Sequence, residues 1–519
     1  MISARCDGII AVIVADWPDS ANPQIPENKT LSIDGRSISD CSQLLLPLAM
    51  QIKSELVMND GTDADIEFVL SECVHFNQLL SAMTPDEFVQ RLSSADSSAY
   101  LTLSNGRQII CGVKALRRLH DLATRTLRSS DASDTVEPDR VYRSLKQMVA
   151  LNFIEQQVPA DVSNVERVLA AAVEEAKQSR SDAVHFIPCR LIHAKEPSTF
   201  NVGPVLFYAH DAFEKRVETL YADYIRRADS EQQRQTCEVL VSNAKHYYDG
   251  FSWVGEVKIL QCDSAISIER ANLAVHAALN VLHVLLGADH TGRMAVGGPR
   301  LADDSRAHLH LDADGLLDVS GSRSATSEVG FGDGLSKFFE RADVASLVKA
   351  AAKAIEPLVD PNIRRPLGLR VIDAFAWFGD AAREQSDGAR IIKATNALER
   401  LLATSERKGI GVTKAFCRRG AAICYDGDSR ETFDDLAGQF KAAYEIRSDL
   451  AHGFMSPFDP QVKEHAPSFM ILARRALCCA LGLFEQCQLF DQPQSDADLA
   501  PWLDRLAEQT EAEVSHEPS

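Results

Sequence analysis

The stretch Tyr444-Glu-Ile-Arg-Ser-Asp-Leu-Ala-His452-Gly453 ends a segment whose pattern is helical from Phe433 onward. Glycine commonly follows the last residue of a helix, so Gly453 predicts a helix over Phe433–Ala451 with His452 in its final turn. Arg447 precedes His452 by five residues, which places the two about 140° apart around a helix axis. Their side chains therefore meet only at a group outside the helix.

Four further segments around this one have the same helical pattern. Together the five cover Leu369–Ala382, Ala389–Ser405, Val412–Cys424, Phe433–Ala451 and Ser468–Phe484. Polar or glycine-containing turns join them, which is typical of a helical bundle. We therefore expect an all-α bundle over residues 362–490.

The preceding residues mix strand and helix patterns, and a chain of this length is expected to form about two to four domains. We expect an α/β segment over residues 1–130 and an α+β region over residues 138–360, joined by the polar stretch Ser129–Glu137. Residues 491–519 are expected to form a solvated acidic tail that docks Trp502 on the body. The predicted fold class is thus multidomain, with an α+β N-terminal region followed by an all-α bundle.

Within the α+β region, several segments have clear strand or helix patterns. The expected strands are Val184–Cys189, Gly203–Tyr208, Trp253–Gln261 and Ala307–Asp312. The expected helices are Ala212–Arg227, Ile266–Leu286 and Leu335–Leu358. Ile266–Leu286 is a long apolar segment that is almost free of helix-breaking residues from Glu269 onward.

The composition, with 45% hydrophobic and 25% charged residues, is that of an ordinary soluble globular protein. The longest apolar runs, such as residues 8–15, are far shorter than the roughly 20 residues that span a bilayer. No secretory signal is visible at the N-terminus, and the twelve cysteines include no Cys-x-x-Cys. These features predict reduced thiols, a cytoplasmic location and no membrane partner.

The net charge of -20 argues against nucleic-acid binding by the chain as a whole, but the charge is unevenly distributed. Residues 362–490 contain 18 Lys+Arg against 16 Asp+Glu, a balance of +2. Residues 491–519 contain one Arg against eight acidic residues, which leaves -15 for residues 1–361. The expected bundle is therefore the least acidic part, which permits a polyanion to approach it. Ordinary variation between domains would give the same difference.

Arg447 and His452 are chemically suited to phosphodiester cleavage without a metal. A histidine that titrates near neutral pH can move a proton to or from an RNA hydroxyl. A guanidinium, always charged, can hold a phosphate whose negative charge grows in the transition state. The spacing alone is weak evidence, because Arg180 and His185 have the same separation and we interpret that pair as a chance match.

In its wider context, the segment over residues 367–486 resembles the Apea-like branch of the HEPN superfamily. The family hallmark is Arg, four to six residues, then His. The resemblance rests on four stretches: Ala376-Trp-Phe378, Thr395-Asn-Ala-Leu-Glu399, Phe416-Cys-Arg-Arg419 and Tyr444-Glu-Ile-Arg-Ser-Asp-Leu-Ala-His-Gly453. It implies a helical bundle that forms a homodimer or higher homo-oligomer, with the Arg-His motifs of two copies making one metal-independent ribonuclease site. Many such proteins act in antiviral, abortive-infection or toxin systems.

The resemblance also implies roles for individual residues. His452 would be the general acid or base, Arg447 would hold the phosphate, and Ser448 would add a hydrogen bond, although family members often have a more polar residue there. Asp449 would support His452 from three residues before it. For Tyr444 and Glu399, two roles are considered. Tyr444 lines the site or, as we favour, packs in the bundle, and Glu399 orients a side chain or forms an ordinary surface ion pair.

Arg418 and Arg419 are candidates for contacts with an RNA backbone, although arginine doublets on helices usually face solvent. The resemblance implies no cofactor and no metal, and it implies that the N-terminal region senses an unknown trigger ligand or protein. Two alternatives remain open. The bundle is a non-catalytic dimerisation or binding scaffold, or His308 and His310, which alternate with Asp312 on one strand face, hold a catalytic metal ion.

Overall fold

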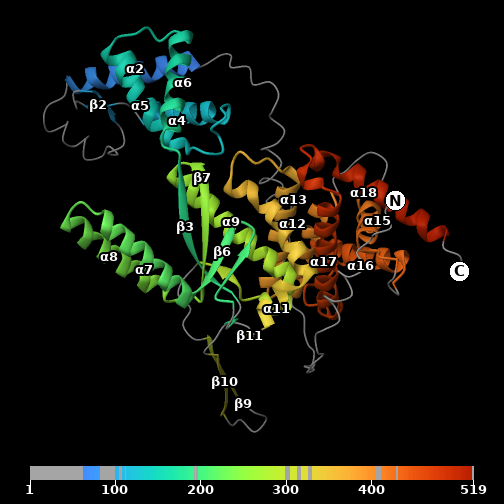
Figure 1. The fold of residues 1–519 in the computed structure, drawn as a ribbon. Coiled ribbons are helices and arrows are strands. Elements are labelled where there is room, and N and C mark those ends of the chain that lie inside the picture. The colour runs from blue at the N-terminus through green and yellow to red at the C-terminus, as the bar shows by residue number, and fades with distance from the viewer. Residues whose placement is uncertain are drawn as a thin grey trace. The chain divides into compact units, whose positions relative to one another are not determined.

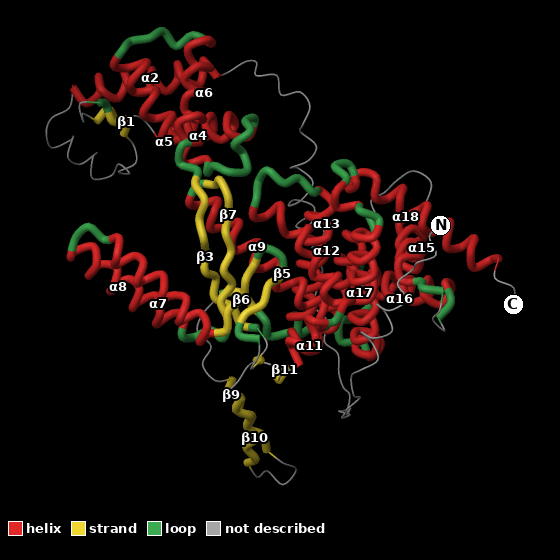
Figure 2. Tube along the Cα trace, viewed as in Figure 1, coloured by secondary structure: helices red, strands yellow, loops and turns green. Residues whose placement is uncertain are grey.

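The computed structural model describes residues 62–81, 100–104, 108–110, 113–191, 193–194, 197–297, 304–311, 317–324, 330–332, 334–403, 411–427 and 431–516. Contacts divide the chain into two compact units, and the boundary along the chain lies between Arg180 and Ser181. One unit lies within residues 16–180, and the other contains residues 181–519. Figures 1 and 2 show that helices dominate both units.

The first unit is a small helical assembly with one hairpin. Its elements are α2 (Thr62–Ser81), β1 (Tyr100–Thr102), β2 (Gln108–Ile110), α4 (Val113–Arg128), α5 (Pro138–Val149), the π-helical η1 (Ala150–Glu155) and α6 (Val162–Lys177). β1 and β2 pair antiparallel. The helices share one core, to which α4 contributes leucine and alanine side chains and α6 contributes leucine, valine and alanine side chains. The polar stretch Ser129–Glu137 was expected to be a linker. It is a turn inside this unit, because Ala132 and Val136 are buried in the same core.

The second unit begins with a five-stranded antiparallel sheet in the order β5-β6-β7-β3-β8. The strands are β3 (Ser181–Arg190), β5 (Thr199–Val202), β6 (Val205–Ala209), β7 (Trp253–Cys262) and β8 (Ala295–Val296). Smaller pairings join β4 (His193–Ala194) to β11 (Gly330–Gly332) and β9 (Asp304–Leu311) to β10 (Leu317–Ser324). The four strands expected in this region are therefore confirmed, although Asp312 lies outside the described residues.

Helix α9 (Ser264–Leu286) packs against this sheet with one side and against helices with the other (Figure 1). Asp263 begins it as N-cap, since its carboxylate accepts from the backbone N–H groups of Ala265 and Ile266. Gly287, with φ +92°, ends it. The helix lies close to β7 because Gly255 has no side chain, and a Cβ there would lie 3.1 Å from Val275 Cγ1. The expected helix over Ile266–Leu286 is confirmed. It is buried on all sides from Ala277 to Leu286, whereas Ile268 and Leu273 nearer its start are 52% and 50% exposed.

The remaining helices lie on the side of α9 that the sheet leaves free. They are α10 (Ala288–Thr291), α11 (Gly334–Glu340), α12 (Ala342–Val359), α13 (Pro366–Arg383), α14 (Asp387–Leu401), α15 (Val412–Cys424), α16 (Phe433–Ala451), α17 (Pro460–Gln486), η2 (Leu489–Asp491) and α18 (Ser495–His516). Of these, α10, α12, α13 and α17 contact α9. All five helices expected between residues 369 and 484 are present. The predicted helix over Leu335–Leu358 is instead two helices, because Arg341 has an extended backbone between α11 and α12.

The bundle shares most of its core with the sheet, and a small separate cluster of Ile391, Ala443, Val462, Ala466 and Phe469 lies between α14, α16 and α17. Side chains of the sheet, of α9 and of α12–α18 form one continuous hydrophobic cluster. Residues 181–516 are therefore one unit rather than a bundle attached to a separate α+β domain, and the boundary near residue 361 separates elements that share a core. Helix α17 is the only described helix long and apolar enough to cross a membrane, and 67% of its apolar window is buried inside the protein, as in the core helix of a soluble protein.

Two helices, α7 (His210–Arg227) and α8 (Glu231–Tyr248), project from the sheet between β6 and β7 (Figure 1). α7 was expected from its apolar spacing. α8 was not expected, because it has no apolar face that would reveal it: no residue of α8 whose burial is described is buried. Its last turn is fixed at the sheet, where Tyr248 donates from its hydroxyl to the carbonyl of Phe186 at 2.6 Å.

A buried polar junction fixes the C-terminal end of α9 to α13. His283, which is fully buried, lies 2.7 Å from the Thr291 hydroxyl through Nδ1 and 3.1 Å from Arg383 through Nε2. The Thr291 hydroxyl donates to the Gly287 carbonyl, so it accepts from Nδ1–H, and Nε2 accepts from Arg383. This arrangement requires a neutral imidazole. Burial, and then the nearby charge of Arg383, lower the pKa of His283 to about 3.

The junction predicts a loss of stability in mild acid. Because the pKa of His283 is lower in the folded than in the unfolded chain, its contribution is complete above about pH 6.5 and declines as the pH falls toward 3. Between pH 6.5 and 5 the free energy of unfolding should fall by about 2 kcal/mol through this residue. Urea unfolding, followed by the fluorescence of Trp253, Trp377 and Trp502, measures it. In His283→Gln the fall should be correspondingly smaller, and equal pH dependence in both proteins would contradict the assignment.

Candidate functional site

Helix α16, which carries Arg447 and His452, has well-defined ends. Thr432 begins it with a capping box: its hydroxyl accepts from the Asp435 N–H at 3.1 Å, and the Asp435 carboxylate accepts from the Thr432 N–H at 3.0 Å. The helix ends at Ala451 with His452 as C-cap. The sequence-based expectation of a helix over Phe433–Ala451 therefore agrees with the structure at both ends.

A Schellman turn holds His452 at the end of α16. Gly453 has φ +73°, the Phe454 N–H donates to the Asp449 carbonyl at 2.8 Å, and the Gly453 N–H donates to the Leu450 carbonyl at 3.3 Å. The His452 N–H donates to the Ser448 carbonyl at 2.9 Å. The backbone of His452 is thereby fixed, while its imidazole is exposed to solvent.

Arg447, five residues earlier, is held by helix α14. Its Nη2 donates to Glu399 at 3.0 Å and lies 3.5 Å from Asn396 Oδ1. The guanidinium lies 5.9 Å from the centre of the Tyr444 ring. The pair is largely shielded, since 25% of the Arg447 side chain and 21% of the Glu399 side chain are exposed. Arg447 Nε is buried and has no hydrogen-bond partner among the described residues.

The environment of Glu399 determines what Arg447 can bind. Burial raises the pKa of the Glu399 carboxyl, and the charge of Arg447 opposes that change. A phosphate at Arg447 would have to compete with this carboxylate or share the guanidinium with it. Because a guanidinium has five N–H donors, sharing is chemically possible. Glu399 therefore orients Arg447 through a partly buried ion pair rather than through an exposed one.

The structure brings together only some of the residues singled out by the sequence. Tyr444 packs in the bundle against Phe416, with ring centres 5.3 Å apart. Ser448 and Asp449 contribute backbone carbonyls to the turn described above. Within the described part of the chain, the ring of His452 has one aromatic neighbour, Phe454 at 6.1 Å, and makes no hydrogen bond or ion pair with Arg447 or Asp449. Arg447 and His452 are thus close in the chain but not bonded to each other.

Sequence reasoning did not single out Asn396 as a partner of Arg447. It lies three residues before Glu399, so both side chains project from neighbouring positions of α14. The signal was the Thr395-Asn-Ala-Leu-Glu399 stretch itself, in which Asn396 and Glu399 lie on the same face of the helix.

Two exposed phenylalanines lie beside the candidate site. Phe454 is 82% exposed and Phe458 is 92% exposed. Both are in the loop between α16 and α17, directly after His452. Exposed apolar side chains indicate a contact surface when they cluster, and these two lie four residues apart in one loop. The loop is therefore a candidate contact surface.

Arg418 and Arg419 are not available for RNA, contrary to the expectation that they contact its backbone. Arg419 is 5% exposed and binds Asp504 at 2.7 and 2.9 Å as well as two backbone carbonyls at the end of α14. Arg418 binds both carboxylate oxygens of Glu511 at 2.6 Å. The two arginines therefore hold helix α18 to the bundle.

The tail expected to be a solvated appendage is, over Ser495–His516, a docked amphipathic helix. Its Trp502 packs against Phe484, with ring centres 5.9 Å apart, as expected for that residue. The acidic residues facing the bundle recur every seven or eight positions: Asp496 pairs with Arg370, Asp504 with Arg419 and Glu511 with Arg418. The +2 balance of residues 362–490 is thus partly neutralised by this helix, which weakens it as an indication of polyanion binding.

The other Arg-His pair and the candidate metal ligands are elsewhere. His185 lies in β3 and its Nε2 is 2.7 Å from the buried hydroxyl of Ser267, so the matched spacing at Arg180 and His185 has no helical context. His308 and His310 lie in β9, opposite Ser320 and Asp318 of β10. The metal site predicted for these two histidines also includes Asp312, which is outside the described residues.

No protein-family model, no curated protein and no solved structure matches this chain. The resemblance to the HEPN superfamily therefore depends on the quoted stretches of sequence alone.

The Schellman turn predicts opposite effects for two glycines of the same region. No atom within 4 Å would obstruct a Cβ at Gly438, inside α16, or at Gly453, but only Gly453 has positive φ. Gly438→Ala should raise the free energy of unfolding by about 0.5–1 kcal/mol, and Gly453→Ala should lower it by about 1 kcal/mol. Urea denaturation of the two variants measures this. The same sign for both would show that the turn does not fix the end of the helix.

The docking of α18 predicts a large effect for a single buried charge. Asp504→Asn removes the charged partner of the buried Arg419, and should lower the free energy of unfolding by about 2–4 kcal/mol. The exposed pair Lys441–Glu445, at 3.7 Å, provides the matched control, since Glu445→Gln should leave stability nearly unchanged. Equal effects of the two substitutions would indicate that α18 is not held by its ion pairs.

Proposed function

We propose that the protein is a HEPN-type, metal-independent endoribonuclease that acts as a homodimer. The observation that supports it best is the state of His452: a Schellman turn fixes its backbone and leaves its imidazole exposed, five residues after an arginine that α14 orients. A fixed, solvent-accessible histidine beside a cation is what general acid-base cleavage of a phosphodiester needs.

The proposed reaction uses the substrate's own 2′-hydroxyl. His452 accepts the proton of that hydroxyl while the 2′-oxygen forms a bond to phosphorus and the bond from phosphorus to the 5′-oxygen breaks. The leaving 5′-oxygen receives a proton from the protonated imidazole of the second copy or from solvent. The products are a 2′,3′-cyclic phosphate and a 5′-hydroxyl, and no water, metal or oxidant is consumed.

Arg447 would hold the non-bridging oxygens as their charge grows. Its remaining Nη protons are the donors for this contact, while Glu399 and Asn396 keep Nη2 in place. Because Arg447 and His452 make no bond with each other within the described residues, one chain presents half of a site. Two copies related by a twofold axis at the α16 end would supply the other half.

The remaining assignments belong to the same proposal. The N-terminal region would sense a trigger ligand or protein and control the bundle, the protein would be cytoplasmic, and its role would be antiviral defence by RNA cleavage. The supporting observation is the division of the chain into two compact units, of which only the second carries the Arg-His pair.

Removing the imidazole tests the proposal. His452→Ala should reduce cleavage of single-stranded RNA by roughly 100-fold or more, because the proton transfer loses its catalyst. Denaturing gels of end-labelled RNA, run with a chelator present, measure the cleavage. A substrate with a single 2′-deoxy position at the cleavage point should resist the wild-type protein.

The matched control is His465→Ala. His465 is a partly buried histidine on α17 whose ring stacks on Phe469, with centres 5.8 Å apart, so its loss should leave cleavage unchanged. Undiminished cleavage by His452→Ala, or cleavage of the 2′-deoxy substrate, would reject the ribonuclease assignment.

Two observations favour a second function, a non-catalytic dimerisation scaffold. Arg447 is already paired with Glu399, and the loop after His452 exposes Phe454 and Phe458. A scaffold would use this loop as its contact surface and would not cleave RNA. Sedimentation distinguishes the two: for a scaffold, Phe454→Ser with Phe458→Ser gives monomers while the wild-type dimer shows no cleavage at any concentration.

A further inference from the structure

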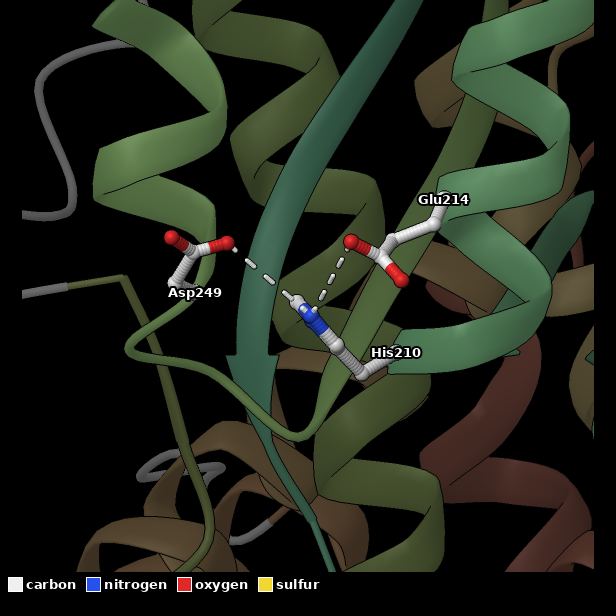
Figure 3. A group of neighbouring side chains, drawn as sticks. All are labelled: His210, Glu214 and Asp249. Carbon is white, nitrogen blue, oxygen red and sulfur yellow. Dashed lines mark ion pairs between the residues drawn. The ribbon is translucent and has the colours of Figure 1, made fainter. Parts of the chain in front are cut away.

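Three potential metal ligands meet where the α7–α8 arm joins the sheet (Figure 3). His210 Nε2 lies 3.9 Å from a Glu214 carboxylate oxygen and 4.0 Å from an Asp249 carboxylate oxygen. All three ligand atoms lie within 4.8 Å of one another. Within the described ranges, this is the only group of three or more His, Cys, Asp or Glu side chains with that geometry.

The distances fit an ion better than they fit direct hydrogen bonds. Both gaps exceed the range of a hydrogen bond, roughly 2.7–3.2 Å between heavy atoms. Three atoms separated by 3.9, 4.0 and at most 4.8 Å have a common point no more than about 2.5 Å from each. Small shifts of the side chains would bring them to the roughly 2.0–2.2 Å of zinc bonds to nitrogen and oxygen. The pair His120–Asp139 shows the contrast, since there the ring nitrogen contacts a single carboxylate at 3.2 Å.

The surroundings of His210 leave one nitrogen for a ligand. Nδ1 is buried and has no hydrogen-bond partner in the described part of the chain, whereas Nε2 faces both carboxylates (Figure 3). The two carboxylates also lie close to each other, an arrangement of like charges that a cation between them would relieve. The side chains are 29–50% exposed, so an ion can reach them from solvent.

The backbone holds the three ligands in place. His210 is the first residue of α7, directly after β6, and its N–H donates to the Ser252 carbonyl at 2.9 Å. Glu214 follows one turn later on α7. Asp249 is the C-cap of α8, and its N–H donates to the Lys245 carbonyl at 2.9 Å. The site therefore joins the start of α7 to the end of α8, between the end of β6 and the start of β7.

We propose that His210, Glu214 and Asp249 bind a divalent transition-metal ion such as Zn²⁺, with solvent completing its coordination. One imidazole and two carboxylates suit Zn²⁺, whereas Ca²⁺ and Mg²⁺ prefer sites made only of oxygen. The bound ion fixes the base of the arm, because it links α7 to α8. This site is separate from Arg447 and His452, and it does not depend on the proposed RNA cleavage.

Calorimetric titration of the purified full-length chain with Zn²⁺ tests the site. The wild-type chain should bind one more Zn²⁺ ion than His210→Ala does. Glu214→Gln and Asp249→Asn, which preserve side-chain size, should weaken that binding roughly tenfold or more. His120→Ala is the control and should bind as the wild type does. Circular dichroism identifies any variant that fails to fold, and the Gln and Asn variants then decide the result.

Two further readouts identify the ligands and the effect. Co²⁺ bound at this site should show no sulfur-to-metal charge-transfer band, which distinguishes it from cobalt held by one of the chain's cysteines. The Tm of the wild type should rise with Zn²⁺ concentration, and the Tm of His210→Ala should rise less. Equal stoichiometry and affinity in the wild type and all three ligand variants, or a thiolate band that accounts for all bound Co²⁺, would overturn the proposal.

Discussion

The fold of residues 181–516 depends on the burial of the second half of α9, where every residue from Ala277 to Leu286 is buried. Because this half is apolar around almost its whole circumference, other elements must cover each of its faces. The sheet covers one face and α12, α13 and α17 cover the rest. Because of that burial, polar groups at the end of the helix lie inside the protein. His283, Thr291 and Arg383 give one another hydrogen-bond partners there. Arg474 adds two donors to the last carbonyls of α9.

Ion pairs along α18 hold this helix to the bundle, in addition to its hydrophobic contacts. Three acidic residues on one face of α18 meet three arginines on α13 and α15. Between them the same helix buries Leu499, Leu503 and Ala507. Charges that look in the sequence like two separate regions, a near-neutral bundle and a strongly acidic tail, are therefore two sides of one interface. The net charge of either region taken alone says little about what it binds.

Features encoded by neighbouring residues were predicted from the sequence, whereas contacts between residues far apart in the chain were not. Helix α16 was predicted at both ends because its cap and its final glycine are encoded within about twenty residues. The partners of Arg419 could not be predicted in the same way, because Asp504 lies 85 positions away and nothing local distinguishes a buried arginine from an exposed one. Helix α8 was missed because none of its residues whose burial is described is buried, and Asp249, at its end, was missed with it. For the candidate site, the sequence predicted the positions of Arg447 and His452 but not how α14 engages the guanidinium.

The shared core has a consequence for how such a chain can change over generations. A segment that is exchanged between proteins by recombination survives only if it keeps its own hydrophobic interior. A break near residue 361 would leave α9 and α12 without half of their cover and would expose the matching face of α13. The sheet, the central helix and the bundle are therefore expected to be inherited together. The N-terminal unit has its own core and is the part that can be exchanged.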